Sequence, residues 1–452
     1  MHWYKRVIFV RKNKPRIAVV QRKQVPGSPD RYTPDDLGCI KEMISETFEL
    51  SIGGIKELIG PGDRVLVKIN QVEARAPEKG VTTDPRVLHA LVELLFEAGA
   101  GKVQIGERSA QNGDTLANMR ICGTAGVADK TGAELVPFER DGYRMVNVPN
   151  ARVLSKIPVP KSILDADKYI LLPKLKIHSM CKMTCAVKLQ LGIMPDYDWM
   201  NLFHTEAINA KLVDILKAVH PDFVLTDSLW ACQGNGPVSP FEEDKIKDFN
   251  TLIAGTDPVA LDSVAAYLIG FDDPREIETT NIASADGLGT ADLDKIEVKG
   301  ADLEKIRRNF RRRDLRLQGM KLSHRGWEPN IQVILGGACV GCKALLRMHL
   351  DECVSRGYPE KIEKPVTVFC GIQQHLDQLP KELPGPVIIY GDCAYNSLKG
   401  IGLLDRYLKG ESLVIRERPE FGLGGCFPNL GGRSWPQHDL LGFVDYVDSL
   451  IK

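Results

Sequence analysis

The stretch DPRVLHALVELLFEAGAGKVQIGE, residues 84–107, contains the alternation that decides the fold of the first part of the chain. Asp84 suits a helix N-cap, Pro85 suits the first helical position, and apolar residues then recur at helical spacing until glycine ends the pattern. Residues 102–107 form a short strand pattern, and DRVLVKIN at 63–70 is a strand before the helix. This order predicts a layered α/β domain.

The same alternation continues to about residue 300. We expect further strands at 168–177, 223–228 and 251–256, and helices at 205–220 and 257–270. A second series of strands follows at NIQVILG (330–336), KPVTVFCG (364–371), GPVIIYGDC (385–393) and ESLVIRE (411–417). The fold class is therefore α/β, with a larger layered domain at 1–300, a basic linker at 301–327 and a smaller flavodoxin-like domain at 328–452.

The composition of the 452 residues is that of a globular protein, and its 59 basic and 59 acidic residues balance. We expect no nucleic-acid partner, because no net charge attracts one. No apolar run is long enough to span a bilayer, and charges interrupt the first twenty residues, so we expect a cytoplasmic protein without a membrane partner. Eleven cysteines in a reducing compartment favour metal or redox chemistry over disulfides.

In the second domain the cysteines follow strands. Cys339 and Cys342 come after the first, Cys393 after the third, and Cys426 lies in a glycine-rich loop beyond the fourth. The carboxyl ends of parallel strands meet at one edge, so four thiolates can converge there. One C-x2-C pair with two single cysteines fits a 4Fe-4S cluster better than structural zinc. Cys370, which ends another strand, could replace one of the four.

The motifs ACVGC (338–342), YGDCA (390–394) and GGCFP (424–428) resemble the proximal-cluster domain of hydrogenase small subunits and a related quinone-reductase subunit. The resemblance covers about 330–430 and implies a 4Fe-4S cluster on these cysteines. That family usually has proline directly after the last cysteine, whereas here Phe427 precedes the proline.

The stretch LLPKLKIHSMCKMTCAVKLQLGIMP, residues 171–195, gathers basic and hydroxyl groups at a strand-to-helix turn. Side chains two apart on a strand point to the same side, and side chains four apart on a helix share a face. We therefore expect an anion site. The candidate catalytic residues are His178, His204 and Lys188, and the candidate substrate-binding residues are Lys68, Asn70, Lys174, Lys176 and Thr184. A second metal on Cys181, Cys185 or Cys232 is left open.

The motifs VKIN (67–70), PKLKIH (173–178), TCAVKL (184–189) and DPVALD (257–262) together resemble the domain-of-unknown-function family 362 over about 60–275. The family's lysines and histidine are present here, while Leu189 replaces an amide residue. Family members often come with iron–sulfur modules. The family itself implies no reaction.

These patterns favour an iron–sulfur oxidoreductase that passes electrons from the cluster to a small anionic substrate or a second centre in the N-terminal cleft. The histidines would shuttle protons near neutral pH. A ferredoxin-type electron donor and an oligomer are both compatible with this hypothesis. The alternatives are a non-redox carrier of an anion or metallocofactor, with a structural or sensory cluster, and a lyase or isomerase with an inert cluster.

Overall fold

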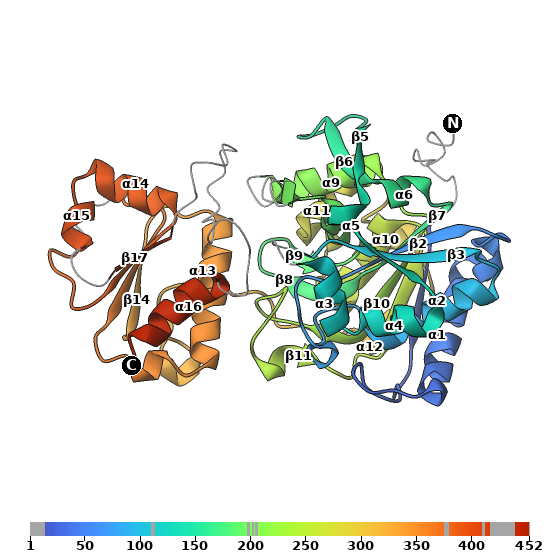
Figure 1. Cartoon of the computed structure of the whole chain (residues 1–452), viewed down its shortest axis with the longest axis horizontal. Helices are drawn as coiled ribbons and strands as arrows, with labels where there is room; N and C mark the ends of the chain where they lie inside the picture. The colour runs from blue at the N-terminus through green and yellow to red at the C-terminus, as the bar shows by residue number, and fades with distance from the viewer. Residues whose placement is uncertain are drawn as a thin grey trace. The chain divides into compact units, whose positions relative to one another are not determined.

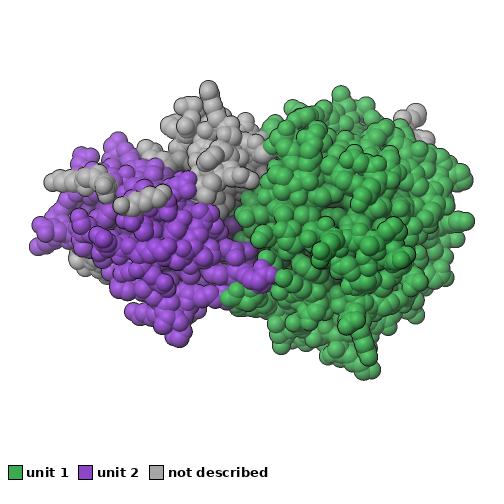
Figure 2. All heavy atoms as spheres, turned by 60° about the horizontal axis from the view of Figure 1, so that its bottom comes forward, with its two compact units in different colours: residues 1–203, 207–238, 243–312 green, residues 204–206, 239–242, 313–452 purple. Residues whose placement is uncertain are grey.

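The computed structural model describes residues 14–109, 114–196, 199–200, 203, 207–374, 379–408, 412–415 and 439–451. The chain forms two compact units, which Figure 2 colours separately: residues 1–203, 207–238 and 243–312, and residues 204–206, 239–242 and 313–452. The division falls between residues 312 and 313, inside the basic segment 301–327. Both units combine helices with largely parallel sheets, so the predicted α/β class is confirmed.

A large mixed sheet organises the first unit, with its longest path in the order β13-β1-β12-β10-β7-β2-β3-β4. The strands are β1 Arg16–Gln21, β2 Arg64–Ile69, β3 Lys102–Glu107, β4 Glu134–Pro137, β7 Lys168–Leu172, β8 Lys174–His178, β9 Lys182–Thr184, β10 Phe223–Cys232, β11 Lys245–Ile246, β12 Thr251–Gly255 and β13 Glu297–Gly300. Strands β4, β3, β2, β7 and β10 run parallel, whereas β12 is antiparallel to β10 and β1. A separate ribbon pairs β5 Tyr143–Asn147 with β6 Lys156–Pro160.

Helices cover both faces of this sheet (Figure 1). Helices α1 Pro34–Ile52, α2 Pro85–Glu97 and α4 Thr124–Thr131 pack on one face, and α9 Ile208–Ala218, α10 Pro258–Leu268 and α11 Glu278–Ala285 pack on the other. Strand β7 is an example of a strand that is buried on both faces. Ile170 and Leu172 belong to the core that includes α1, α2 and α4, whereas Tyr169 and Leu171 belong to the core that includes α9, α10 and α11. Shorter helices lie at α3 Thr115–Ile121, α5 Phe138–Asp141, α6 Lys161–Asp165 and α12 Leu303–Ile306.

The start of α2 follows the sequence prediction, since Asp84 is its N-cap and accepts a hydrogen bond from the Arg86 backbone N–H. Two other predictions need correction. The expected strand 168–177 is two strands, β7 and β8, interrupted at Pro173, which has no N–H to give to a ladder. Thr184 ends strand β9 and does not share a helix with Lys188, because α7 begins only at Ala186 (Ala186–Leu189).

The second unit has a four-stranded parallel sheet in chain order: β14 Ile331–Leu335, β15 Val366–Cys370, β16 Val387–Tyr390 and β17 Ser412–Ile415. Helices α13 Val340–Ser355 and α16 Asp439–Ser449 pack on one face, and α14 Asp392–Gly400 and α15 Leu404–Tyr407 on the other. On β15, Val368 and Cys370 face α13, while Phe369 faces α14. No helix in the described ranges is long and apolar enough to cross a membrane.

Core packing in the first unit predicts a large effect at Phe48, whose ring stacks on Phe223 at 4.3 Å between centroids, both rings being fully buried. Phe48→Ala should lower the free energy of unfolding by about 3–5 kcal/mol, because the cavity cannot fully collapse. Urea denaturation followed by circular dichroism measures this. Ile121→Ala, at a side chain that is 49% exposed, is the control, and equal losses in the two variants would contradict the packing argument.

Candidate functional site

Several strands of the large sheet end at one edge, where ligands bind in open α/β sheets. Lys68, near the end of β2, lies in register with Gly106 of β3 and Leu171 of β7. The next residues along those two strands bring Glu107 and Leu172 to the same edge. Residues from three separate parts of the sequence therefore meet around Lys68.

A buried ion pair joins the ends of β2 and β3. The Lys68 ammonium donates to Glu107 Oε1 at 2.7 Å and to the Ile69 carbonyl at 3.0 Å. The Glu107 carboxylate also accepts from the backbone N–H groups of Gln71 and Arg108. Burial lowers the pKa of Lys68 and raises the pKa of Glu107 to about 7, although each partner opposes the shift of the other.

Lys176 in β8 is completely buried, and its oxygen partners are neutral. Its ammonium donates to Asn70 Oδ1 and to the Val81 carbonyl, each at 2.7 Å. Burial lowers its pKa to about 7, and the positive charges of Lys188 and Lys174 act in the same direction. The structure thus brings the predicted residues Asn70 and Lys176 together.

Lys174 is also buried, but it has a carboxylate partner. Its ammonium lies 2.9 Å from Asp227 Oδ2 in β10. Asp227 Oδ2 also accepts the backbone N–H of Asp84 at 2.8 Å, and the Asp84 carboxylate pairs with Arg86. The Lys174 charge is therefore part of a network that fastens the start of α2 to the sheet.

His178 ends β8 and is 5% exposed. Its Nδ1 accepts the backbone N–H groups of Met180 and Cys181 at 3.0 and 3.2 Å, so the neutral ring carries its proton on Nε2. A side chain at Gly236 would put its Cβ 1.8 Å from the Ile177 carbonyl oxygen, so only glycine lets this loop approach β8. The other predicted histidine, His204, lies outside the described residues.

Thr184 and Lys188 bring two further polar groups to this edge of the sheet, a buried hydroxyl and the amine of a half-buried side chain. Thr184 lies opposite Lys176 in the β8–β9 register, and its buried hydroxyl has no hydrogen-bond partner within the described chain. Burial lowers the pKa of the Lys188 amine, which Cys181 and Glu107 oppose. A Cβ at Gly192 would lie 2.2 Å from Glu107 Oε1 and 2.5 Å from Lys68 Nζ, so the backbone closes tightly on that pair.

The charges of this cluster do not balance. The positive charge of Lys188 acts to lower the pKa of both Lys68 and Lys176, and the Glu107 carboxylate opposes the lowering at all three lysines. Within the described ranges, no hydrogen bond or ion pair joins Lys188 to an acceptor. Because burying an uncompensated ammonium is costly, this arrangement is suited to an anionic ligand.

The sequence pattern does not single out Glu107 and gives no role to Asp262, the last residue of the DPVALD motif. Glu107 is the last residue of the strand pattern KVQIGE, and an acidic residue at the end of a strand is usually expected to be exposed on the surface. Asp262 accepts the backbone N–H groups of Ala186 and Val187, which fixes the start of α7, and burial raises its pKa to about 6. The signal that the sequence offered was an acidic residue within an apolar helix, five residues after the N-cap Asp257 in DPVALD.

The three cysteines considered for a second metal are all buried. The Cys185 thiol lies 3.4 Å from the Thr226 hydroxyl, and the Cys232 thiol donates to the Gly80 carbonyl at 3.2 Å. Burial raises the pKa of both thiols. In the parts of the chain that the structure describes, no group of three or more His, Cys, Asp or Glu side chains is arranged to hold a metal ion.

In the second unit, thiols from separate loops lie close together at the carboxyl edge of the sheet. The Cys342 thiol lies near enough to those of Cys339, Cys370 and Cys393 for each of them to act on its pKa. Cys339 is the N-cap of α13, Cys342 lies in the first turn, and Cys393 lies in the first turn of α14. Cys426 lies outside the described residues.

Two thiols of this cluster, Cys339 and Cys342, favour the neutral form. The pKa of Cys339 is raised first by the neighbouring Cys342 thiol and then by burial. At Cys342 the neighbouring Cys339 thiol lowers the pKa, but the Cys370 thiol and burial outweigh it, so the pKa is raised. Burial raises the pKa of Tyr390, the last residue of β16, and the Cys342 and Cys370 thiols act in the same direction.

The first unit is therefore an α/β domain with a buried lysine cluster at the edge of its sheet, and comparison with known proteins gives its family. The model of a family described as domain of unknown function (DUF362) matches residues 65–267. A thylakoid-associated protein of Synechocystis is 31% identical over 253 residues, which span 53% of this chain and 72% of that protein. The chain belongs to domain-of-unknown-function family 362.

Two solved structures show weaker likeness. The lactate racemase apoprotein from Thermoanaerobacterium thermosaccharolyticum has a TM-score of 0.37 and 8% identity, covering 90% of this chain and 95% of its own. A protein from Thermotoga maritima has a TM-score of 0.35 and 12% identity, covering 86% and 97%. No conclusion about activity follows from likenesses this weak.

The raised pKa of Glu107 predicts how stability changes with pH. Its ordinary pKa is 4.5 and its folded pKa is about 7, so the folded protein binds the proton more tightly than the unfolded chain does. The stabilisation is complete below the lower value and is lost as pH rises through the upper one. Glu107→Gln should remove this dependence, which amounts to at most about 1.4 kcal/mol per pH unit.

Urea denaturation across this pH range measures the effect. Glu134→Gln, at an exposed position on neighbouring β4, should keep the wild-type profile. Parallel profiles for wild type and Glu107→Gln would show that the carboxyl group does not titrate between the two values.

Proposed function

We propose that the protein is an iron–sulfur oxidoreductase, in which the second unit binds a 4Fe-4S cluster and the first binds a small anionic substrate. The observation that carries the proposal is the approach of thiols from three strand ends, Cys339 and Cys342, Cys370, and Cys393, to one edge of a parallel sheet. Cysteine thiolates are the usual ligands of iron–sulfur clusters. The sequence motif around Cys426 supplies a further thiol in the proposal.

The local chemistry fits such a group. The N-termini of α13 and α14 adjoin the thiols, and helix N-termini stabilise thiolates and anionic centres. The pKa values of Cys339 and Cys342 are raised in the absence of metal, and a bound metal would deprotonate its ligands. When bound, the cluster would supply one-electron transfer, and a ferredoxin-type protein is the proposed electron donor.

The excess positive charge around Lys188 supports the anion site. Lys68 and Lys176 both interact electrostatically with it and share the Glu107 carboxylate, and the Thr184 hydroxyl has no hydrogen-bond partner among the described residues. Lys174 has a less direct role in this proposal, because its ammonium is already paired with Asp227. We assign proton transfer to His178 and His204. A cytoplasmic location stays a prediction, and one relative is thylakoid-associated.

Metal analysis tests the cluster. Protein purified without oxygen should contain about four irons and four sulfides per chain, and reduction should produce a paramagnetic signal. Cys342→Ser should lose most of the iron. Cys353→Ser, a buried thiol later in the same helix α13, should keep it. Stoichiometric zinc without iron, or equal iron in both variants, would contradict the proposal, and a cluster that cannot be reduced would favour the non-redox carrier.

Anion binding tests the lysine cluster independently. Lys188→Met keeps most of the packing volume of the side chain but removes its charge, so malonate and inorganic phosphate should bind about ten- to a hundredfold more weakly. Titration calorimetry gives the affinities, and iron content reports whether the rest of the protein is intact. Lys182→Met is the control, since that ammonium donates to the Glu276 carbonyl instead. Unchanged affinity in Lys188→Met would exclude Lys188 from the site.

A further inference from the structure

A polar cavity lies in the first unit, where the chain after α12 returns over the C-terminal end of α10. Its volume is about 540 Å³, within the range of small-molecule sites. The backbone N–H groups of Arg308 and Phe310 donate to the carbonyls of Leu268 and Ile269, so the returning chain caps the helix end. Gly270 must be glycine here, because its φ is +101° and a Cβ would lie 2.6 Å from Asn309 Oδ1.

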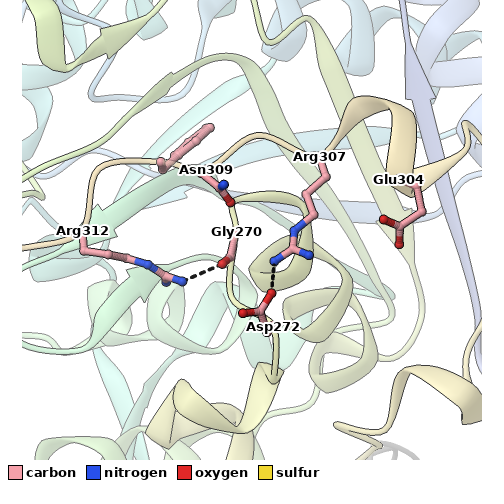
Figure 3. A pocket seen from close by; sticks show the side chains of 7 residues that line it. Gly270, Asp272, Glu304, Arg307, Asn309 and Arg312 are labelled. Atoms are coloured by element: carbon pink, nitrogen blue, oxygen red, sulfur yellow. Dashed lines mark hydrogen bonds and ion pairs between the residues drawn. The ribbon is translucent and has the colours of Figure 1, made fainter.

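Two arginines reach into this cavity from opposite sides, as Figure 3 shows, with Gly270 and Asn309 between them. The Arg312 guanidinium lies over the Phe271 ring at 3.2 Å and donates to the Gly270 carbonyl at 2.7 Å. Arg307 lies over the Tyr267 ring at 4.3 Å. Both forks are therefore held in position before any ligand arrives.

The donors of these arginines are not all used. Arg312 has five N–H groups, and its single hydrogen bond among the described residues is the one to a neutral carbonyl. Arg307 pairs with Asp272 at 2.5 Å, yet its buried Nε finds no partner within the described chain. Burial lowers the pKa of Arg312. The charge of Arg307 acts in the same direction, and the charges of Glu276 and Asp272 act against it.

The carboxylates of the cavity are already engaged. Asp272 binds Arg307, and Glu304 accepts the Tyr267 hydroxyl. Among the described residues that line the cavity, Arg312 has a positive charge for which no carboxylate partner is found. Because planar guanidinium forks match the oxygens of phosphate, we propose that this cavity binds the phosphate group of a small phosphate monoester through Arg312 and Arg307. The buried Phe310 ring in its wall would contact the organic part.

This site is separate from the lysine cluster and does not rest on the proposed redox function. The test uses the full-length protein and titration calorimetry with sn-glycerol 3-phosphate, with inorganic phosphate and glycerol as comparisons. Arg312→Gln should weaken binding of the ester by at least about tenfold. Arg312→Lys should also weaken binding of the ester. A lysine ammonium that keeps the hydrogen bond to the Gly270 carbonyl cannot also offer phosphate the paired N–H groups of a guanidinium.

Two variants serve as controls. Arg308→Gln changes a neighbouring arginine that pairs with Asp248 outside the cavity, and Lys188→Met changes the lysine cluster. Both should bind the ester as wild type does. Inorganic phosphate that binds as tightly as the ester and loses its affinity in Arg312→Gln, but not in Lys188→Met, would assign the cavity to the free ion. Three results would overturn the proposal. They are no saturable binding of the ester at millimolar concentration, equal affinity of the ester for wild type and Arg312→Gln, or an affinity for the ester that falls only in Lys188→Met.

Discussion

Burial of lysine ammonium groups at the carboxyl edge of the large sheet is the constraint on which the first unit depends. A charged group removed from water is tolerated only when oxygens surround it. Lys68 obtains Glu107, Lys174 obtains Asp227, and Lys176 obtains neutral oxygens. These partners come from β2, β3 and β10 and from the loop after β2, so the same contacts that satisfy the charges also fix the order and spacing of the strand ends.

The lysines at this edge are not equivalent, and their partners distinguish a structural role from a role in ligand binding. Lys174 and Asp227 form a matched pair whose carboxylate also anchors the first residue before α2. A ligand would have to compete with that carboxylate to reach Lys174. Lys188 has no such competitor among the described residues, and Lys176 has neutral partners that an anion would complement. The excess charge therefore lies on the side of α7, toward Lys188.

Much of this could be predicted from the sequence because the signals are local. Asp84 and Pro85 mark the start of α2, and alternating apolar runs mark the strands. The failures concern interactions over long sequence distances. No residue near Glu107 in the sequence indicates that Glu107 will be buried in an ion pair with Lys68, thirty-nine residues earlier. Likewise, α7 starts at Ala186 because Asp262 caps it, and no pattern within residues 171–195 contains that information.

The two units use one geometric principle for different chemistry. Parallel strands place the residues that follow them at a common edge, and the first unit fills this edge with ammonium groups while the second fills it with thiols. Thiols tolerate burial better than ammonium groups, because they remain neutral until a metal or a base removes their protons. The starts of α13 and α14 lie beside them, so the backbone dipoles already favour the negative charge that metal binding would create. The second edge is thus stable as neutral thiols and still prepared for an anionic centre.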